Sequence, residues 1–137
     1  MDKKLEVLIL DDELIVCKRL KPAIEKMGCN VETFLEPREA LSRLEEKPFD
    51  IVITDIRMDE IDGIQVLEHV RQQSERTIVI VITGYAMVSL AREAMEKGAF
   101  DFISKPFKPD EIRSVILKAA EELGTPLNYE LASKSPS

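Results

Sequence analysis

Short strand-like runs of apolar residues alternate five times along this chain with longer stretches in which apolar residues recur three and four positions apart. A short run rich in β-branched residues is typical of a buried strand, and the longer spacing is typical of an amphipathic helix. The predicted strands are Val7–Leu10, Asn30–Phe34, Ile51–Thr54, Ile78–Thr83 and Phe100–Ile103. Strict alternation of strand and helix predicts an α/β fold, a five-stranded parallel sheet with helices on both faces.

Proline, glycine and aspartate mark where the predicted helices begin and end. Pro37 and Pro109 stand where a first helical turn is expected, and Gly28 and Gly98 stand just past helix ends. Asp62 precedes the apolar run of the third helix and is a suitable N-cap, because its side chain can accept a hydrogen bond from the helix backbone. These signals indicate a helix after each strand.

The length of 137 residues fits one domain with a core of its own. The helical pattern stops at about Leu123, so we expect a folded domain over residues 1–122 and a flexible tail or the start of a linker over residues 123–137. That tail is too short for a second folded module. We therefore expect either a single-domain protein or a domain of a longer protein.

The composition excludes several classes of protein. A net charge of −7 argues against a chain that coats nucleic acid or binds an anionic membrane surface. The longest apolar runs are too short to span a bilayer, and the N-terminus does not resemble a signal peptide. Cys17 and Cys29 form no CxxC pair and suit buried thiols in a reducing compartment. We expect a cytoplasmic protein that contacts neither nucleic acid nor membrane directly.

Polar side chains follow four of the five predicted strands. They are Asp11 and Asp12 after the first strand, Asp55 after the third, Thr83 at the end of the fourth, and Ser104 and Lys105 after the fifth. In a parallel α/β sheet, ligands bind outside the carboxyl ends of the strands. We therefore expect these side chains to converge at one edge of the sheet and to form a site.

This set of side chains has the chemistry of a phosphoryl site. Three neighbouring carboxylates repel one another unless a cation neutralises them, and a hard divalent ion with oxygen ligands suits them, Mg²⁺ before Ca²⁺. Lys105 adds a positive charge and Thr83 adds a hydroxyl donor for phosphoryl oxygens. Asp55 is central and is the best-placed nucleophile, because an aspartate can form an aspartyl phosphate.

Four motifs in this order resemble one known family. They are LILDDE, IVITDIRM, VITGYA and FISKPF. With this spacing the chain is similar, over about residues 5–122, to the receiver domain of two-component response regulators, the CheY-like family. The resemblance implies a flavodoxin-like (βα)5 fold with strand order 2-1-3-4-5. It also implies a regulator rather than an enzyme, since the only reactions would be phosphotransfer to the domain itself and autodephosphorylation.

The resemblance implies a role for each site residue. Asp55 would accept a phosphoryl group from a phosphohistidine on a sensor histidine kinase or a phosphotransfer protein. Asp12, Asp55 and the backbone carbonyl of Arg57 would bind Mg²⁺, with Mn²⁺ as a substitute, and Asp11 would act through water. Lys105 would pair with the phosphorylated Asp55, and its bond to the following proline would be cis.

The resemblance also implies a switch. Thr83 would move toward the phosphoryl oxygen and Phe102 would turn inward, although alternation with Phe100 alone would place Phe102 in the core. The surface formed by the fourth helix, fifth strand and fifth helix would then change, for homodimerisation or for docking of a target. The first helix, which begins at Glu13 beside the pocket, would approach the kinase.

One position departs from the family pattern. Members commonly have Met-Pro after the phosphoacceptor, and here Met58 is followed by Asp59. Loss of the proline gives the loop more backbone freedom, and Glu60 and Asp62 add negative charge near the pocket. Our hypothesis is that metal affinity or the phosphoryl lifetime is altered.

Three other classes share parts of this pattern. A Mg²⁺-dependent phosphohydrolase of the haloacid dehalogenase type needs a second aspartate two residues after its nucleophile, where this chain has Arg57. A flavin-binding electron carrier needs a phosphate-binding loop after the first strand, where Asp11 and Asp12 would repel a phosphate. A phosphorelay donor would use His69, the only histidine, but a solvent-facing bystander is the more ordinary interpretation.

Overall fold

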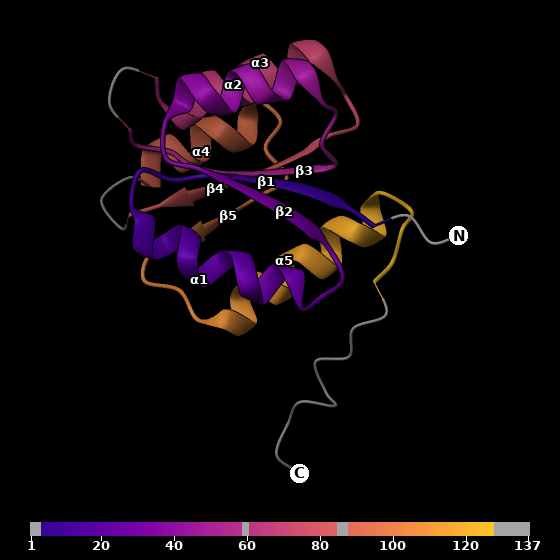
Figure 1. The fold of residues 1–137 in the computed structure, drawn as a ribbon. Coiled ribbons are helices and arrows are strands. Elements are labelled where there is room, and N and C mark those ends of the chain that lie inside the picture. Colours follow the sequence, from indigo (N-terminus) through magenta and orange to yellow (C-terminus); the bar gives the residue numbers. More distant parts are fainter. Residues whose placement is uncertain (1–3, 59–60, 85–87, 128–137) are drawn as a thin grey trace.

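The computed structural model describes residues 4–58, 61–84 and 88–127. Within these ranges strands and helices alternate as predicted, and Figure 1 shows their arrangement. The strands are β1 (Glu6–Leu10), β2 (Asn30–Phe34), β3 (Ile51–Asp55), β4 (Ile78–Thr83) and β5 (Asp101–Ser104). The helices are α1 (Leu14–Glu25), α2 (Pro37–Glu46), α3 (Gly63–Gln73), α4 (Val88–Glu96) and α5 (Pro109–Glu122).

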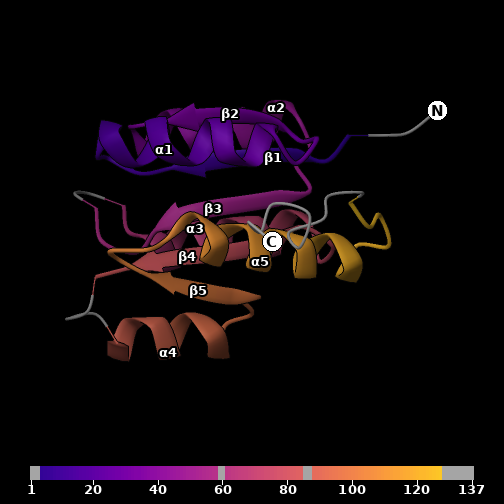
Figure 2. The same ribbon diagram turned by 90° about the horizontal axis from the view of Figure 1, so that it is seen from below.

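The strands form one parallel sheet in the order β2-β1-β3-β4-β5, which confirms the predicted fold class and strand order. Helices α1 and α5 cover one face of the sheet, and α2, α3 and α4 cover the other (Figure 1). The arrowheads of the strands point to the same side in Figure 2, so their carboxyl ends share one edge. Residues that follow different strands are thereby brought together at that edge.

Two clusters of buried side chains hold the helices to the sheet. In β1, Val7 and Ile9 belong to the cluster shared with α1 and α5, whereas Leu8 and Leu10 belong to the cluster shared with α2 and α3. Successive side chains of a strand point to opposite faces, so a strand that is covered on both faces is apolar at nearly every position. This explains the continuous apolar runs of β1, β3 and β4.

The predicted helix boundaries are confirmed at several positions. The Asp62 side chain accepts a hydrogen bond from the Gln65 backbone at 2.9 Å, and the Gln65 side chain accepts one from the Asp62 backbone at 2.9 Å, which together form a capping box. Past the ends of α1 and α4, Gly28 and Gly98 have φ angles of 95° and 108°. Few other residues adopt this left-handed region without strain.

At Phe102 the interpretation from local alternation is wrong, because its side chain is 41% exposed and does not belong to the core. Strand β5 begins at Asp101, one residue later than predicted, and it is an edge strand with a single neighbour. Within β5 only Ile103 is buried. An edge strand has less covering structure than a central one, so alternation alone does not decide the burial of its side chains.

Helix α5 ends at Glu122, and the chain continues along the domain for a few residues. Leu123 is 6% exposed, and its carbonyl accepts a hydrogen bond from Arg76 Nη2 at 2.8 Å. Leu127 packs against the same core cluster. The predicted tail extends past Leu127 to residues 128–137, which lie outside the described residues, so the domain boundary and the flexible tail stay predictions. In the described part of the chain, every helix is too short or too polar to cross a membrane.

Candidate functional site

Three aspartates meet at the carboxyl edge of the sheet, as predicted. Asp55 is the last residue of β3, and Asp11 and Asp12 directly follow β1, which is its neighbour in the sheet. One carboxylate oxygen from each of the three lies within 4.8 Å of the others. Asp11 is 0% exposed and Asp55 is 6% exposed, whereas Asp12 faces solvent. The cluster therefore has two buried carboxylates and one that is accessible to solvent.

Lys105, which follows β5, brings a positive charge into this cluster. Its Nζ lies 2.5 Å from Glu13 Oε1, 3.2 Å from Asp11 Oδ2 and 3.4 Å from Asp55 Oδ2. The contact with Asp11 Oδ2 is an ion pair without hydrogen-bond geometry, so this buried oxygen has no hydrogen-bond partner among the described residues. The Lys105–Pro106 peptide is cis, as the family resemblance implies.

Thr83 is the last residue of β4, the strand next to the one that ends in Asp55. It is 2% exposed, and its carbonyl accepts a hydrogen bond from the Lys105 backbone at 2.7 Å. This backbone hydrogen bond holds Lys105 next to Thr83. Ser104 is the register partner of Thr83 and is exposed.

The loop after β3 holds the remaining predicted ligand. Arg57 is exposed, and its backbone N–H donates a hydrogen bond to Asp55 Oδ1 at 3.4 Å. The role of the Arg57 carbonyl as a metal ligand stays a prediction. Asp59 and Glu60 lie outside the described residues, so the hypothesis about the missing proline also remains a prediction.

Burial dominates the electrostatics of the site. It raises the pKa of Asp11 to about 6, and the charge of Asp55 adds to the increase, while the Glu13 backbone N–H and Lys105 oppose it. Burial likewise raises the pKa of Asp55 against the opposing charge of Lys105. Burial alone would lower the pKa of Lys105, but Glu13, Asp11 and Asp55 outweigh it and raise that pKa. Lys105 thus stays protonated, whereas burial makes ionisation of Asp11 and Asp55 unfavourable.

The donor set fits a hard divalent cation. Carboxylate oxygens are the ligands that Mg²⁺ prefers, and the buried Asp11 Oδ2 accepts no hydrogen bond from the described residues. Asp11, Asp12 and Asp55 would hold such an ion, which would offset the repulsion that the carboxylates exert on one another.

Two residues of the site were not singled out as functional from the sequence. Glu13 contributes a third carboxylate contact to Lys105, and the only signal for it is its place directly after the acidic pair. Gly63 is the first residue of α3, and a Cβ atom there would lie 2.5 Å from the Asp55 carbonyl oxygen and 2.7 Å from Ile56 Cα. Only glycine lets the helix begin this close to Asp55.

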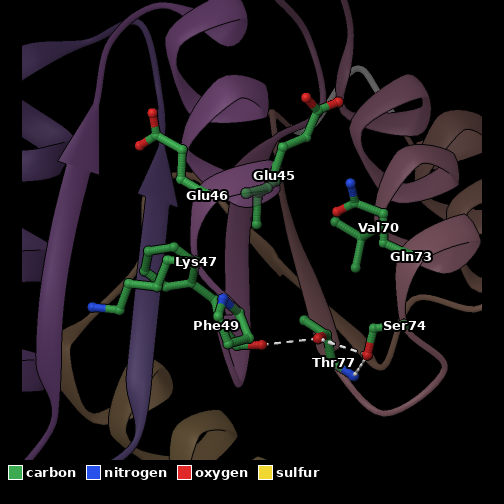
Figure 3. Close-up of a pocket in the computed structure, with 10 residues that line it drawn as sticks. Glu45, Glu46, Lys47, Phe49, Val70, Gln73, Ser74 and Thr77 are labelled. Atoms are coloured by element: carbon green, nitrogen blue, oxygen red, sulfur yellow. Dashed lines mark hydrogen bonds between the residues drawn. The ribbon is translucent and has the colours of Figure 1, made fainter.

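The opposite end of the strands carries a separate hollow of about 400 Å³, between the C-terminal ends of α2 and α3 (Figure 3). There Thr77 Oγ1 donates a hydrogen bond to the Phe49 carbonyl at 2.8 Å and lies 3.0 Å from Ser74 Oγ (Figure 3).

We expected His69, on α3, to face solvent, but its side chain is only 24% exposed and its Nε2 lies 3.9 Å from Glu45 Oε2. It packs toward α2 and is not one of the clustered side chains at the carboxyl edge.

Comparison with known proteins gives consistent matches. The model of the response regulator receiver domain matches residues 7–117. The regulatory protein AtoC of Escherichia coli (strain K12) is 39% identical over 115 residues, which make up 84% of this chain and 25% of AtoC. The chain thus spans about a quarter of the length of this curated relative.

Solved structures agree with these matches. A response regulator receiver domain protein from Clostridium thermocellum is 28% identical, with a TM-score of 0.81 over 85% of this chain and 94% of that one. The beryllofluoride-activated NtrC4 receiver domain dimer is 33% identical, with a TM-score of 0.81 over 86% of this chain and 98% of that one. The family model covers most of the described sheet and its helices, and this chain belongs to the response regulator receiver domain family.

Proposed function

We propose that this chain is the phosphoacceptor switch of a two-component system and that Asp55 receives the phosphoryl group. The observation that carries the proposal is the convergence of a buried aspartate, two further acids and a lysine at one edge of the sheet. The donor would be a phosphohistidine on a sensor histidine kinase or a phosphotransfer protein. An Asp55 carboxylate oxygen would form the new O–P bond while the N–P bond breaks, and the imidazole would leave with the electron pair.

Each neighbour has a defined task in this transfer. Lys105 neutralises charge on the phosphoryl oxygens, and the Thr83 hydroxyl donates a hydrogen bond to one of them. Asp11, Asp12, Asp55 and the Arg57 carbonyl would hold Mg²⁺, or Mn²⁺ as a substitute. When bound, the metal supplies further neutralisation of the transferred group.

The readout would pass through Thr83 and Phe102. The Phe102 side chain is 41% exposed on β5, and it would turn inward when Thr83 moves toward the phosphoryl group. The α4-β5-α5 surface would then dimerise or dock an output domain. Dimerisation has a precedent in the similar NtrC4 receiver domain, which is a dimer in its beryllofluoride-activated form. Because the match covers only 25% of AtoC, the effect of the switch on an output domain belongs to the proposal.

The kinase would approach the beginning of α1. Leu14 and Ile15 are 51% and 58% exposed there, and a hollow of about 360 Å³ between Ile15, Arg19 and Phe107 extends to Lys105. Exposed apolar side chains beside a reactive centre suit a transient protein partner. A cytoplasmic location and the absence of direct nucleic-acid or membrane contact by this chain remain predictions.

The test is incubation with a small phosphodonor such as acetyl phosphate and Mg²⁺, followed by intact-mass measurement. We expect a single phosphoryl adduct on the wild type and on the control Asp110→Asn, which changes an exposed aspartate at the start of α5. Asp55→Asn should carry no adduct. An unmodified wild type, or an adduct that persists in Asp55→Asn, would contradict the proposal.

A further inference from the structure

Glu13 stands at the N-cap of α1 but does not cap the helix. Its backbone is extended, with φ −97° and ψ 110°, and its side chain makes no cap hydrogen bond. Instead Oε1 accepts a hydrogen bond from Lys105 Nζ at 2.5 Å, across 92 positions of sequence. This is the shortest of the three carboxylate contacts of Lys105, and the one with Asp55 is the longest.

The three carboxylates differ in how easily they can move away from Lys105. Lys105 Nζ lies within 3.4 Å of a carboxylate oxygen of each of three acids and donates hydrogen bonds to Glu13 and Asp55, so a phosphoryl oxygen that binds Lys105 must compete with these acids for the ammonium group. Asp11 and Asp55 are buried and fixed at strand ends, with side chains 0% and 9% exposed. The Glu13 side chain is flexible, stands at the start of a helix and is 56% exposed. Glu13 is therefore the acid that moves away from Lys105.

We propose that Glu13 is a positioning residue that competes with the phosphoryl site on Asp55 for Lys105, so that full engagement of Lys105 by a phosphoryl group requires the shorter Glu13–Lys105 contact to break. The inference rests on the proposed function. Glu13 is kept in place by its backbone N–H, which donates a hydrogen bond to Asp11 Oδ1 at 2.8 Å. Its contact with Lys105 therefore tunes how strongly a phosphoryl group, or a mimic of one, is bound.

The chain offers a matched control for a merely structural role. Glu36 is the N-cap of α2, also extended, with φ −113° and ψ 125°, and also without a side-chain cap hydrogen bond. It is exposed and follows a strand of the same sheet. Replacing Glu36 by glutamine removes the same charge from an equivalent helix position without touching Lys105.

A second variant separates contact from charge. Glu13→Gln removes the carboxylate, whereas Glu13→Asp keeps a negative charge near the site on a side chain that is one methylene shorter. If the contact with Lys105 matters, both variants should behave alike. If only the repulsion between Glu13 and an anion matters, Glu13→Asp should behave like the wild type.

The experiment titrates the full chain with beryllofluoride at saturating Mg²⁺ and follows binding by amide NMR. We expect Glu13→Gln and Glu13→Asp to bind beryllofluoride about twofold to fivefold more tightly than the wild type, the range that corresponds to loss of an exposed ion pair. Glu36→Gln should bind like the wild type. Before beryllofluoride is added, the side-chain ammonium signal of Lys105 should shift in both Glu13 variants and not in Glu36→Gln.

Each outcome has a fixed meaning. Unchanged or weaker binding by Glu13→Gln overturns the inference, as does tighter binding by Glu13→Gln alone with wild-type behaviour of Glu13→Asp. An equal gain in Glu36→Gln also overturns it, because the effect would then be one of general charge. Failure of the wild type to bind beryllofluoride would instead overturn the proposed function, and the inference that rests on it would fall with it.

Discussion

Replacing Asp11 with asparagine is expected to stabilise the fold at neutral pH, although it damages the site. Asp11 is 0% exposed, and burial with the charge of Asp55 raises its pKa from 3.8 to about 6. A raised pKa in the folded state means that folding favours the protonated carboxyl group. The contribution of Asp11 to stability is therefore complete below pH 4 and is lost as the pH rises through 6.

The size of the effect follows from the shift. One pKa unit corresponds to about 1.4 kcal/mol, so ionised Asp11 lowers the free energy of unfolding at pH 7 by about 3 kcal/mol. Asparagine has nearly the same shape and keeps an oxygen for the hydrogen bond from the Glu13 backbone, but it carries no charge. We expect Asp11→Asn to be more stable by about 2–3 kcal/mol at pH 7 and by much less at pH 4.

Urea unfolding in EDTA, at pH 7 and at pH 4, measures this difference. The slopes of the unfolding curves should match, so that a change in midpoint reports stability alone. Asp12→Asn is the control, because Asp12 is exposed and its charge is already solvated. Destabilisation of the protein by Asp11→Asn at pH 7, or an equal gain in stability at both pH values, would refute this prediction.

Three further changes test other parts of the structure. Gly63→Ala should lower the free energy of unfolding by about 1–3 kcal/mol and slow phosphorylation, because a Cβ would lie 2.5 Å from the Asp55 carbonyl oxygen. Urea unfolding measures the change in stability, and the rate of adduct formation measures phosphorylation. Burial raises the pKa of Cys17 to about 11, so iodoacetamide at pH 8 should leave it unmodified in the folded protein and label it in urea. Phe102→Ala should change stability by about 0.5 kcal/mol or less, since the side chain is 41% exposed, but should weaken any beryllofluoride-dependent dimer seen by sedimentation.

Local patterns carried most of the fold and the main site residues, and tertiary structure decided the rest. Asp55 was predictable because it ends a strand that is buried at every position, and parallel topology brings such ends together. Three features were not predictable in this way. Exposure of Phe102 depends on the edge position of β5, and the role of Gly63 depends on how closely α3 approaches Asp55. The Glu13–Lys105 contact depends on side chains that periodicity does not describe.

The destabilising charge of Asp11 also predicts how the stability of the folded domain responds to a metal ion. A ligand that binds only the folded state stabilises it by about 2.7 kcal/mol when its concentration is a hundred times the dissociation constant. Mg²⁺ at that excess should therefore recover most of the stability that ionised Asp11 removes at pH 7, in urea unfolding of the wild type. Asp11→Asn and Asp55→Asn have fewer carboxylate oxygens in the cluster and should gain much less from the same Mg²⁺. An equal gain in wild type and both variants would mean that Mg²⁺ acts elsewhere on this acidic chain, and the three aspartates would lose their assignment as its ligands.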